Sequence, residues 1–450
     1  METSSGTLAC YAQMVPPEVL AQIFILFSES QENRWVGRRA APLILMQICH
    51  YWRQAALSTP RVWRRLSAYV RNAGAFESKA AFMRLWLSRS GSGPLDISLA
   101  ETCCYAWAST SPTMAVISDY LHRCRSLELR VPESRIQWFT PPQAPILSRL
   151  TVIYGPRTHR DYGKDLGLAF SPHIRILDLD LDYLRRLHSG SVQWAGLHTL
   201  SVSGVLSAYE ILAVLHECSS LRHCDLAFYG SDNEEEAEYQ ETVKMDHLER
   251  LSLHYNDDSV VDMVVEKLDT PGLTSLAIYA DECCEGFLAT WRSVLPEAGS
   301  MLKDLFIKCD GGILPDSDIF SDFLRQLEHL EDLTIICSRL GDPFNGDVEG
   351  FLQALTLSTD DTPSSTLLPR LRKLELTGVS QIITMRKPSL DTCVQEFCSS
   401  RPLSSGLQSV SVKWCVPGDA HVTCWSREDS RQIEVGYEDP VVLMAECGDS

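Results

Sequence analysis

Three carboxylates alternate along one short apolar stretch of the sequence, at Asp178, Asp180 and Asp182. In an extended strand, residues two apart point to the same side, so these side chains would lie in one line. Grouped carboxylate oxygens are ligands that divalent cations such as Ca²⁺ accept. The alternative is that they are the outward residues of a repeated strand, facing solvent or a basic partner. We favour this alternative and predict no metal site.

Other residues with reactive side chains form no recognisable catalytic arrangement. Cys283 and Cys284 are adjacent, and adjacent cysteines rarely bridge, so a redox pair is not expected. His254 has no identifiable carboxylate partner. The Gly-x-Ser-x-Gly elbow, the His-Glu-x-x-His motif, the Walker loop and a Gly-x-Gly-x-x-Gly loop after a strand are absent. We therefore expect no catalytic residue and no cofactor; a hydrolase is an alternative that no nucleophile and base support.

The strongest pattern in the sequence is a repeated spacing of apolar residues, leucine-x-x-leucine-x-leucine with conservative replacements. Its second and third positions are two apart, which predicts a strand with one buried face. The central positions are 23 to 29 residues apart, except for the last two intervals of 41 and 36 residues. The pattern occurs eleven times, at Cys124/Leu127/Leu129, Leu147/Leu150/Val152, Ile174/Leu177/Leu179, Leu197/Leu200/Val202, Leu221/Cys224/Leu226, Leu248/Leu251/Leu253, Leu273/Leu276/Ile278, Leu302/Leu305/Ile307, Leu330/Leu333/Ile335, Leu371/Leu374/Leu376 and Leu407/Val410/Val412.

Runs with helical periodicity separate the predicted strands. One strand and one helix per unit resembles the leucine-rich repeat, whose units stack into a curved solenoid with a parallel inner sheet. The fold class implied is an α/β repeat protein. We place this domain at residues 94–440, with candidate closing strands at 422–425 and 433–435 as its C-terminal cap, and expect a frayed tail at 441–450. The helical runs are 114–124, 208–218, 260–268, 287–295, 319–327 and 348–355.

The residues between the buried positions of such a sheet face outward and are candidates for binding a protein. Aromatic side chains supply much of the energy of protein interfaces, which favours Tyr279 and Phe306, with His254 beside them. The sequence does not identify the protein that would bind. The predicted substrate-binding residues are Asp178, Asp180, His254, Tyr279, Phe306 and Lys308.

The N-terminal segment, residues 14–68, has a different pattern and predicts three short amphipathic helices. Pro17 can occupy the first helical position, and Glu18 lies in the first turn, where the helix dipole favours a carboxylate. A second helical spacing runs through residues 45–56, and a third helix is expected to begin at 58–60 and to include Trp63 and Leu66. A further amphipathic helix at 76–87, within a linker at 69–93, would connect this small domain to the repeats.

The residues of this segment also resemble a known family. Pro16-Pro17-Glu18-Val19-Leu20, followed by Ile23-Phe24, resembles the opening of the F-box, and Leu45, Ile48-Cys49, Trp52-Arg53, Ala56-Leu57-Ser58-Thr59-Pro60 and Trp63 resemble its second half in fungal F-box proteins. The resemblance implies docking on the Skp adaptor, and through it on cullin and RING subunits. Carried over, the docking residues would be Pro16, Pro17, Glu18, Leu20, Ile23, Phe24, Leu45, Ile48, Cys49 and Trp52.

Charge and composition limit the partners and the compartment. Up to Pro94, eleven Lys or Arg and five Asp or Glu give a net charge of +6, and the remainder, with 29 and 54, has −25. So acidic a domain repels phosphate backbones, and nucleic acid is not expected as a partner. No apolar stretch is long enough to span a bilayer, and residues 1–13, a predicted flexible leader, lack the features of a signal peptide. We expect a cytoplasmic or nuclear protein without membrane contact, whose scattered cysteines are reduced thiols.

These observations and the resemblance together predict a substrate-recognition subunit of an SCF-type, cullin-RING ubiquitin ligase. The F-box would dock the Skp adaptor, and the leucine-rich repeats would bind a protein substrate. The alternative is a non-catalytic leucine-rich-repeat scaffold that acts outside ubiquitin ligation, with its F-box-like helices packed only against its own solenoid.

Overall fold

The structure of this chain is a computed structural model. It describes residues 15–30, 40–101, 111–131, 144–154, 173–180, 193–204, 208–228, 241–256, 258–280, 301–309, 322–337, 348–356, 367–379, 387–401, 407–416, 419–426 and 434–436. The predicted leader (1–13) and tail (441–450) lie outside these residues. Contacts divide the chain into two compact units, Met1–Gly196 and Leu197–Ser450, and each is described by itself.

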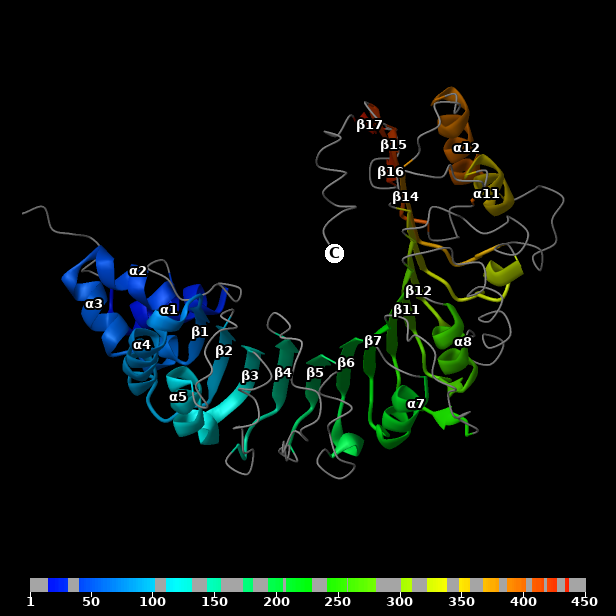
Figure 1. Cartoon of the computed structure of the whole chain (residues 1–450). Helices are drawn as coiled ribbons and strands as arrows, with labels where there is room; N and C mark the ends of the chain where they lie inside the picture. The colour runs from blue at the N-terminus through cyan, green and yellow to red at the C-terminus, as the bar shows by residue number, and fades with distance from the viewer. Residues whose placement is uncertain are drawn as a thin grey trace, which may run out of the picture. The chain divides into compact units, whose positions relative to one another are not determined.

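A parallel sheet dominates both units, and it confirms the predicted α/β fold class (Figure 1). Thirteen of its strands are parallel, and each is the neighbour of the next one along the chain, as in the inner sheet of a leucine-rich-repeat solenoid. The first unit contains β1 (Arg65–Val70), β2 (Leu95–Glu101), β3 (Cys124–Val131), β4 (Arg149–Tyr154) and β5 (Ile176–Asp180). The second contains β6 (Thr199–Gly204), β7 (His223–Phe228), β9 (Arg250–Tyr255), β11 (Ser275–Ala280), β12 (Asp304–Cys309), β13 (Asp332–Cys337), β14 (Lys373–Val379) and β15 (Ser409–Val416).

The eleven predicted triplets form the core beneath this sheet. The second and third positions of every triplet lie on a parallel strand, and all the triplet side chains are at most 6 % exposed. Register keeps equivalent positions side by side: Leu276 of β11 pairs with Leu251 on one side and with Leu305 on the other. Each strand–helix repeat therefore buries its apolar side chains against the next repeat. Burial of this kind stabilises by about 1.5 to 3 kcal/mol per large side chain.

The N-terminal helices differ from the prediction at one break. α1 (Pro17–Ser30) begins at Pro17 with Glu18 in its first turn, as expected. The second predicted helix is wrong as a single helix, because it is divided into α2 (Ala41–Ile48) and α3 (His50–Leu57). Cys49 between them has an extended backbone (φ −158°, ψ 172°), and its Sγ accepts a hydrogen bond from the N–H of Trp52 at 3.4 Å. The sulfur thus caps α3, a local interaction that apolar spacing does not reveal.

The third predicted helix is also wrong. Pro60–Trp63 is a single 3-10 turn, and Leu66 lies on β1, the first strand of the sheet. Leu66, Ala68 and Val70 are buried while the residues between them are not, so the period in this segment is two and not 3.6. Both Trp63 and Leu66 are buried, as helical packing would also have required.

The other described helices lie where helical runs were predicted, except one in the second unit. α4 (Phe76–Ser88) and α5 (Pro112–Tyr120) pack together in the first unit, and α4 lies against β1 (Figure 1). In the second unit, α7 (Ala208–Glu217), α8 (Asp258–Glu266) and α11 (Val348–Leu355) match predicted runs. α12 (Lys387–Ser400) was not predicted, nor was the small parallel pair of β8 (Val243–Lys244) and β10 (Leu268–Asp269). The run at 287–295 and the beginning of that at 319–327 lie outside the described residues.

Two antiparallel strands follow the parallel array, where closing strands were predicted. β16 (Asp419–Ser426) pairs with β15, and β17 (Glu434–Gly436) pairs with β16. The cysteines agree only in part with the expectation of reduced thiols. Cys49, Cys124, Cys218, Cys224, Cys393 and Cys398 are free, but Cys309 at the end of β12 is disulfide-bonded, so the expectation is wrong at that position.

Candidate functional site

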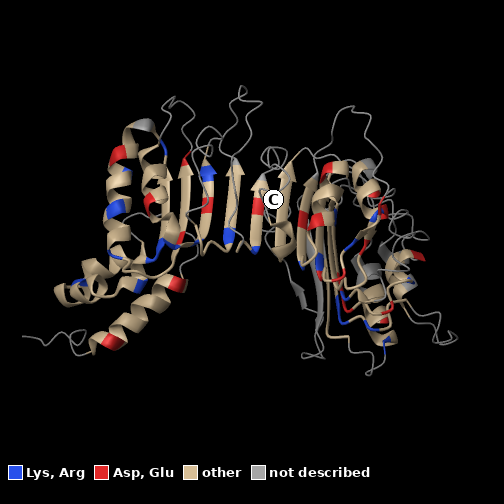
Figure 2. Ribbon diagram, turned by 90° about the horizontal axis from the view of Figure 1, so that it is seen from below, with Lys and Arg blue, Asp and Glu red and all other residues tan. Residues whose placement is uncertain are grey.

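Two helices of the first unit, α1 and α2, expose large apolar side chains. On α1, Val19, Ile23 and Leu26 follow one another at spacings of four and three, so they share one side of the helix. Ile23 is 45 % exposed and Leu26 is 64 % exposed. Ile44 and Ile48 are exposed in the same way, four residues apart on α2. α1 carries charged residues only at Glu18 and Glu29, near its two ends, and none between them (Figure 2).

The predicted docking residues therefore separate into two groups. Leu20, Phe24 and Leu45 are buried in the helical core, where the Phe24 ring lies 5.1 Å from that of Trp52 between centroids. These three anchor the fold and do not present themselves to a partner. Cys49 and Trp52 are half-buried. The residues that remain at the surface are Pro16, Pro17, Glu18, Ile23 and Ile48.

The prediction missed Val19, Leu26 and Ile44 as surface residues. A signal was present in the sequence, because α1 is apolar around most of its circumference and not only on the side that packs inward. A helix of that kind needs either burial on all sides or a second partner. Periodicity cannot say which of two apolar sides the rest of the chain covers.

Two tryptophans connect the helical segment to the sheet. The Trp63 indole N–H donates to the carbonyl of Ala56 in α3 at 2.8 Å, and that of Trp86 in α4 donates to the carbonyl of Arg65 in β1 at 3.1 Å. The two rings meet edge to face, with 5.0 Å between centroids. The exposed side of α1 and α2 thus belongs to a helical segment that is packed firmly on the first strand.

In the second unit, a row of aromatic side chains lies on the outward side of three neighbouring strands. His254 on β9 and Tyr279 on β11 are register partners, and their rings are stacked at 3.9 Å with 5° between planes. Phe306 on β12 is 5.1 Å from Tyr279 between ring centroids. Lys308 is the register partner of Tyr279 on the other side. The structure therefore brings together four of the predicted substrate-binding residues, and we call His254, Tyr279 and Phe306 the aromatic row.

A carboxylate that the prediction overlooked stands beside the aromatic row. Asp225 on β7 has its Oδ1 3.4 Å from Nε2 of His254, so the expectation that His254 lacks a carboxylate partner is wrong. The two residues are diagonal neighbours on adjacent strands. They are far apart in the sequence, so the sequence pattern does not reveal that they meet. Burial, with a smaller contribution from Asp225, raises the pKa of Tyr279 above its usual value. The phenol is therefore a neutral hydrogen-bonding group at physiological pH.

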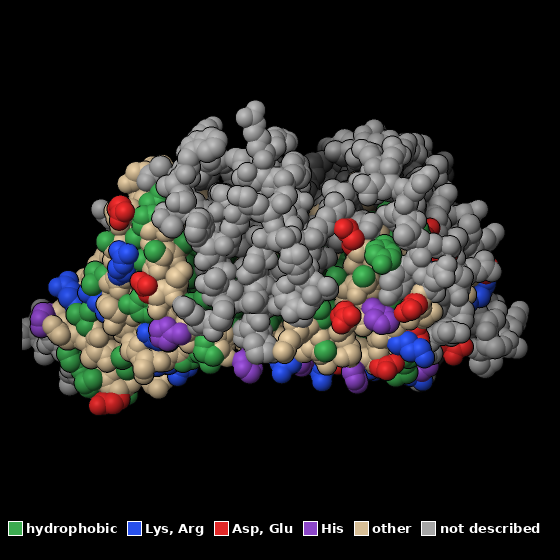
Figure 3. Space-filling model, turned by 60° about the horizontal axis from the view of Figure 1, so that its bottom comes forward, with side chains coloured by type: hydrophobic (Ala, Val, Ile, Leu, Met, Phe, Trp, Pro, Cys, Tyr) green, Lys and Arg blue, Asp and Glu red, His purple; other side chains and the backbone are tan. Residues whose placement is uncertain are grey.

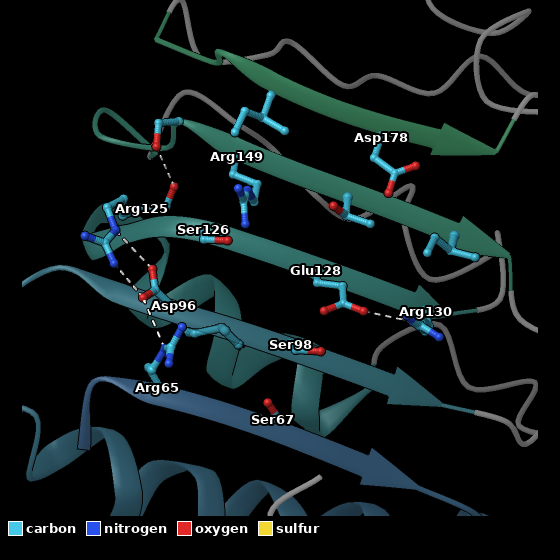
Figure 4. A pocket seen from close by; sticks show the side chains of 15 residues that line it. Arg65, Ser67, Asp96, Ser98, Arg125, Ser126, Glu128, Arg130, Arg149 and Asp178 are labelled. Atoms are coloured by element: carbon cyan, nitrogen blue, oxygen red, sulfur yellow. Dashed lines mark hydrogen bonds and ion pairs between the residues drawn. The ribbon is translucent and has the colours of Figure 1, made fainter. Parts of the chain in front are cut away.

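The outward side of the first unit carries a polar hollow of about 550 Å³ over β1 to β5 (Figure 4). Arg65 and Arg125 both point toward Asp96, and Arg130 pairs with Glu128. Asp178 faces outward here, as predicted for a strand residue. The side chains of Asp180 and Asp182 lie outside the described residues. Within the part of the chain that is described, no three His, Cys, Asp or Glu side chains are grouped so as to hold a metal ion.

Fold and surfaces together define the class of this molecule: an α/β repeat protein whose parallel sheet is like that of leucine-rich-repeat proteins. No known protein family matches the sequence, and no curated protein matches it. Among the described helices, none has the length and apolarity needed to cross a membrane.

Proposed function

We propose that this chain is a substrate-recognition subunit of a cullin-RING ubiquitin ligase. In this proposal α1 and α2 dock the Skp adaptor, and outward residues of the sheet hold the protein to be ubiquitinated. The observation that carries it is the exposed apolar side of α1, formed by Val19, Ile23 and Leu26, on a helix that Leu20 and Phe24 anchor in the core. Apolar side chains gathered on one side of a helix favour a partner that covers them.

The aromatic row supports the substrate-binding half of the proposal. Its rings already contact one another, so they lose little conformational freedom when a partner packs on them. Aromatic side chains are also the commonest energetic anchors of interfaces. The chain then contributes no catalytic residue. It holds a substrate lysine near a conjugating enzyme in the cytoplasm or nucleus, and so raises the effective concentration of the reacting groups.

A pulldown with purified Skp adaptor tests the docking half. We expect the wild-type chain to be retained and Ile23→Asp and Ile48→Asp to be retained at least about tenfold less, because a carboxylate without a partner is costly to bury in an interface. Both positions are exposed, so the fold should be unchanged, which circular dichroism checks.

The matched control is Leu85→Asp. Leu85 is an equally exposed apolar residue of the same unit, but it lies on α4. This variant should be retained like the wild type. If the wild-type chain is not retained, or if all three variants behave alike, the scaffold alternative is favoured instead.

A further inference from the structure

A second hollow in the first unit gathers arginines at the beginning of the sheet. It has a volume of about 380 Å³ and lies where the end of α1 meets the first strands. Its charged lining residues are Arg61, Arg64, Arg65, Arg125, Glu29 and Asp96, and we call it the arginine hollow. Four guanidinium groups against two carboxylates leave a charge of +2. This excess agrees with the net charge of +6 of the residues up to Pro94, in a chain whose net charge is −19.

Three of the four arginines are engaged by the two carboxylates. Arg125 makes a bidentate ion pair with Asp96: its Nε donates to Oδ1 at 3.1 Å and its Nη2 donates to Oδ2 at 2.6 Å (Figure 4). Arg65 lies 3.9 Å from the same carboxylate, and Arg61 pairs with Glu29 at 2.8 Å. The carboxylates are thus already neutralised, and the excess positive charge remains in the hollow.

Arg64 is the arginine without an ion-pair partner among the described residues. Its Nε is buried and has no hydrogen-bond acceptor. Its guanidinium lies directly on Gly93, where the Cβ of any other residue would collide with it. Arg123 in turn holds this turn, donating to the Gly93 carbonyl at 2.9 Å and to Ser90 Oγ at 2.8 Å. The guanidinium of Arg64 is therefore held in place while its buried Nε–H lacks an acceptor, and a buried donor without an acceptor is costly.

We propose that the arginine hollow binds a phosphate monoester carried on a side chain of a protein partner. A phosphorylated side chain has a charge of about −1.5 to −2 at pH 7, which balances the excess of +2, whereas a carboxylate would neutralise only half of it. The flat guanidinium group matches two phosphate oxygens at once. A membrane surface rich in acidic lipids, or a nucleic acid, would be repelled by the rest of this acidic chain, so an isolated phosphate on a peptide is the ligand that fits. This inference goes beyond the proposed function and does not rest on it.

The test uses the full-length chain and two immobilised degenerate peptide libraries that differ only in whether one fixed serine is phosphorylated. We expect binding to the phosphorylated library alone, and competition by inorganic phosphate. Arg64→Gln should weaken this binding at least about tenfold, the loss that removing a charged hydrogen-bond donor produces. Arg84→Gln is the matched control: it removes the same charge from an exposed position on α4, outside the hollow, and should bind like the wild type.

Gly93→Ala tests the geometry without removing charge. The collision involves the end of a flexible side chain, so the chain should fold normally while Arg64 is displaced and binding weakens. The proposal is overturned if both libraries bind equally or not at all, or if Arg64→Gln and Arg84→Gln have the same effect. The chain could instead bind phosphatidylcholine vesicles that contain a phosphoinositide, with Arg64→Gln weakening that binding, and fail to bind the phosphorylated library. This result would also overturn the proposal, in favour of a lipid ligand. No adaptor takes part in these measurements, so their outcome is independent of the pulldown.

Discussion

Burial decides the chemistry of single residues in this protein, and the thiols show it most directly. Cys124 lies at the start of β3 and Cys218 follows α7, and both are buried among repeat side chains. Burial raises the pKa of Cys124 to about 12, although the nearby charge of Arg123 works in the opposite direction. Burial likewise raises the pKa of Cys218 to about 12. Each thiol therefore acts as a small apolar core residue.

We predict that these two thiols resist alkylation in the folded chain. With a pKa of about 12, roughly one thiol in ten thousand is ionised at pH 8, and the thiolate is the reactive form. Iodoacetamide at pH 8, followed by mass spectrometry, should label the half-buried Cys49 first and Cys124 and Cys218 only after denaturant is added. Equal labelling of all three in the folded chain would contradict the burial of the repeat cysteines.

At the scale of strands, regular hydrogen bonds between successive repeats set the register of the sheet. The residue just before a strand donates a backbone hydrogen bond to the equivalent residue of the preceding repeat. Thr274 N–H donates to the Glu249 carbonyl at 2.9 Å, and Lys303 N–H donates to the Thr274 carbonyl at 2.8 Å. This regularity places side chains from different units side by side along one rim, where charged and histidine side chains are visible at the lower edge of Figure 3. It also makes Asp304 of β12 the register partner of Asp332 of β13.

We predict that Asp304→Asn raises the thermal unfolding temperature at pH 7. Asp304 is exposed, but the neighbouring strands remove part of its hydration; this partial desolvation, and then repulsion by Asp332 and Glu331, raises the pKa of the Asp304 carboxyl, so its ionised form is disfavoured in the folded chain. A raised folded pKa contributes stability below the usual pKa of 3.8, and this contribution is lost as the pH rises through the folded value. The gain from Asn should accordingly shrink as the pH is lowered toward 4.

Asp246→Asn provides the comparison for that measurement. Asp246 is an exposed carboxylate of the same unit that lies before β9 and not on a strand pair. Its replacement should leave the unfolding temperature nearly unchanged at every pH. A gain from Asp304→Asn that does not vary with pH would exclude charge repulsion as its cause.

At the scale of the whole molecule, stability depends on contacts between neighbouring repeats and on the strands that cover the last repeat. A repeat array gains stability mainly from contacts between neighbours, so an uncovered end is its weak point. An open strand edge also offers unpaired N–H and C=O groups to other chains. Here β16 runs antiparallel to β15 and pairs with it, so the edge of β15 is occupied, and β17 in turn pairs with β16.

We predict that deletion of residues 417–450 leaves a chain that self-associates. Without β16, the edge of β15 would be free to pair with a second molecule, and the last unit would lose part of its cover. Light scattering coupled to size-exclusion chromatography should detect oligomers, and the unfolding temperature should fall. Deletion of residues 441–450 alone should change neither quantity. A monomeric, equally stable 417–450 deletion would show that the two strands do not protect the edge.

Local spacing was sufficient for much of this structure. Leu127 and Leu129, and every equivalent pair after them, could be placed on buried strands because alternation of apolar residues is itself the condition for one buried face. The start of α1 at Pro17 followed from local chemistry in the same way. The prediction missed the break at Cys49, because a single capping hydrogen bond ends one helix and starts the next there. It also placed Leu66 on a helix, because pairing with β2 is what makes this segment a strand.

By itself, the sequence determined the α/β repeat architecture, since each unit carries its own buried positions and needs only a copy of itself beside it. Only the tertiary structure decided which apolar side chains of α1 are covered. Leu20 is 1 % exposed and Ile23 is 45 % exposed, although both are apolar and lie within one turn of each other. It also decided that His254 meets Asp225 and that four arginines share one hollow. Burial and charge balance depend on residues distant along the chain, and no local pattern contains them.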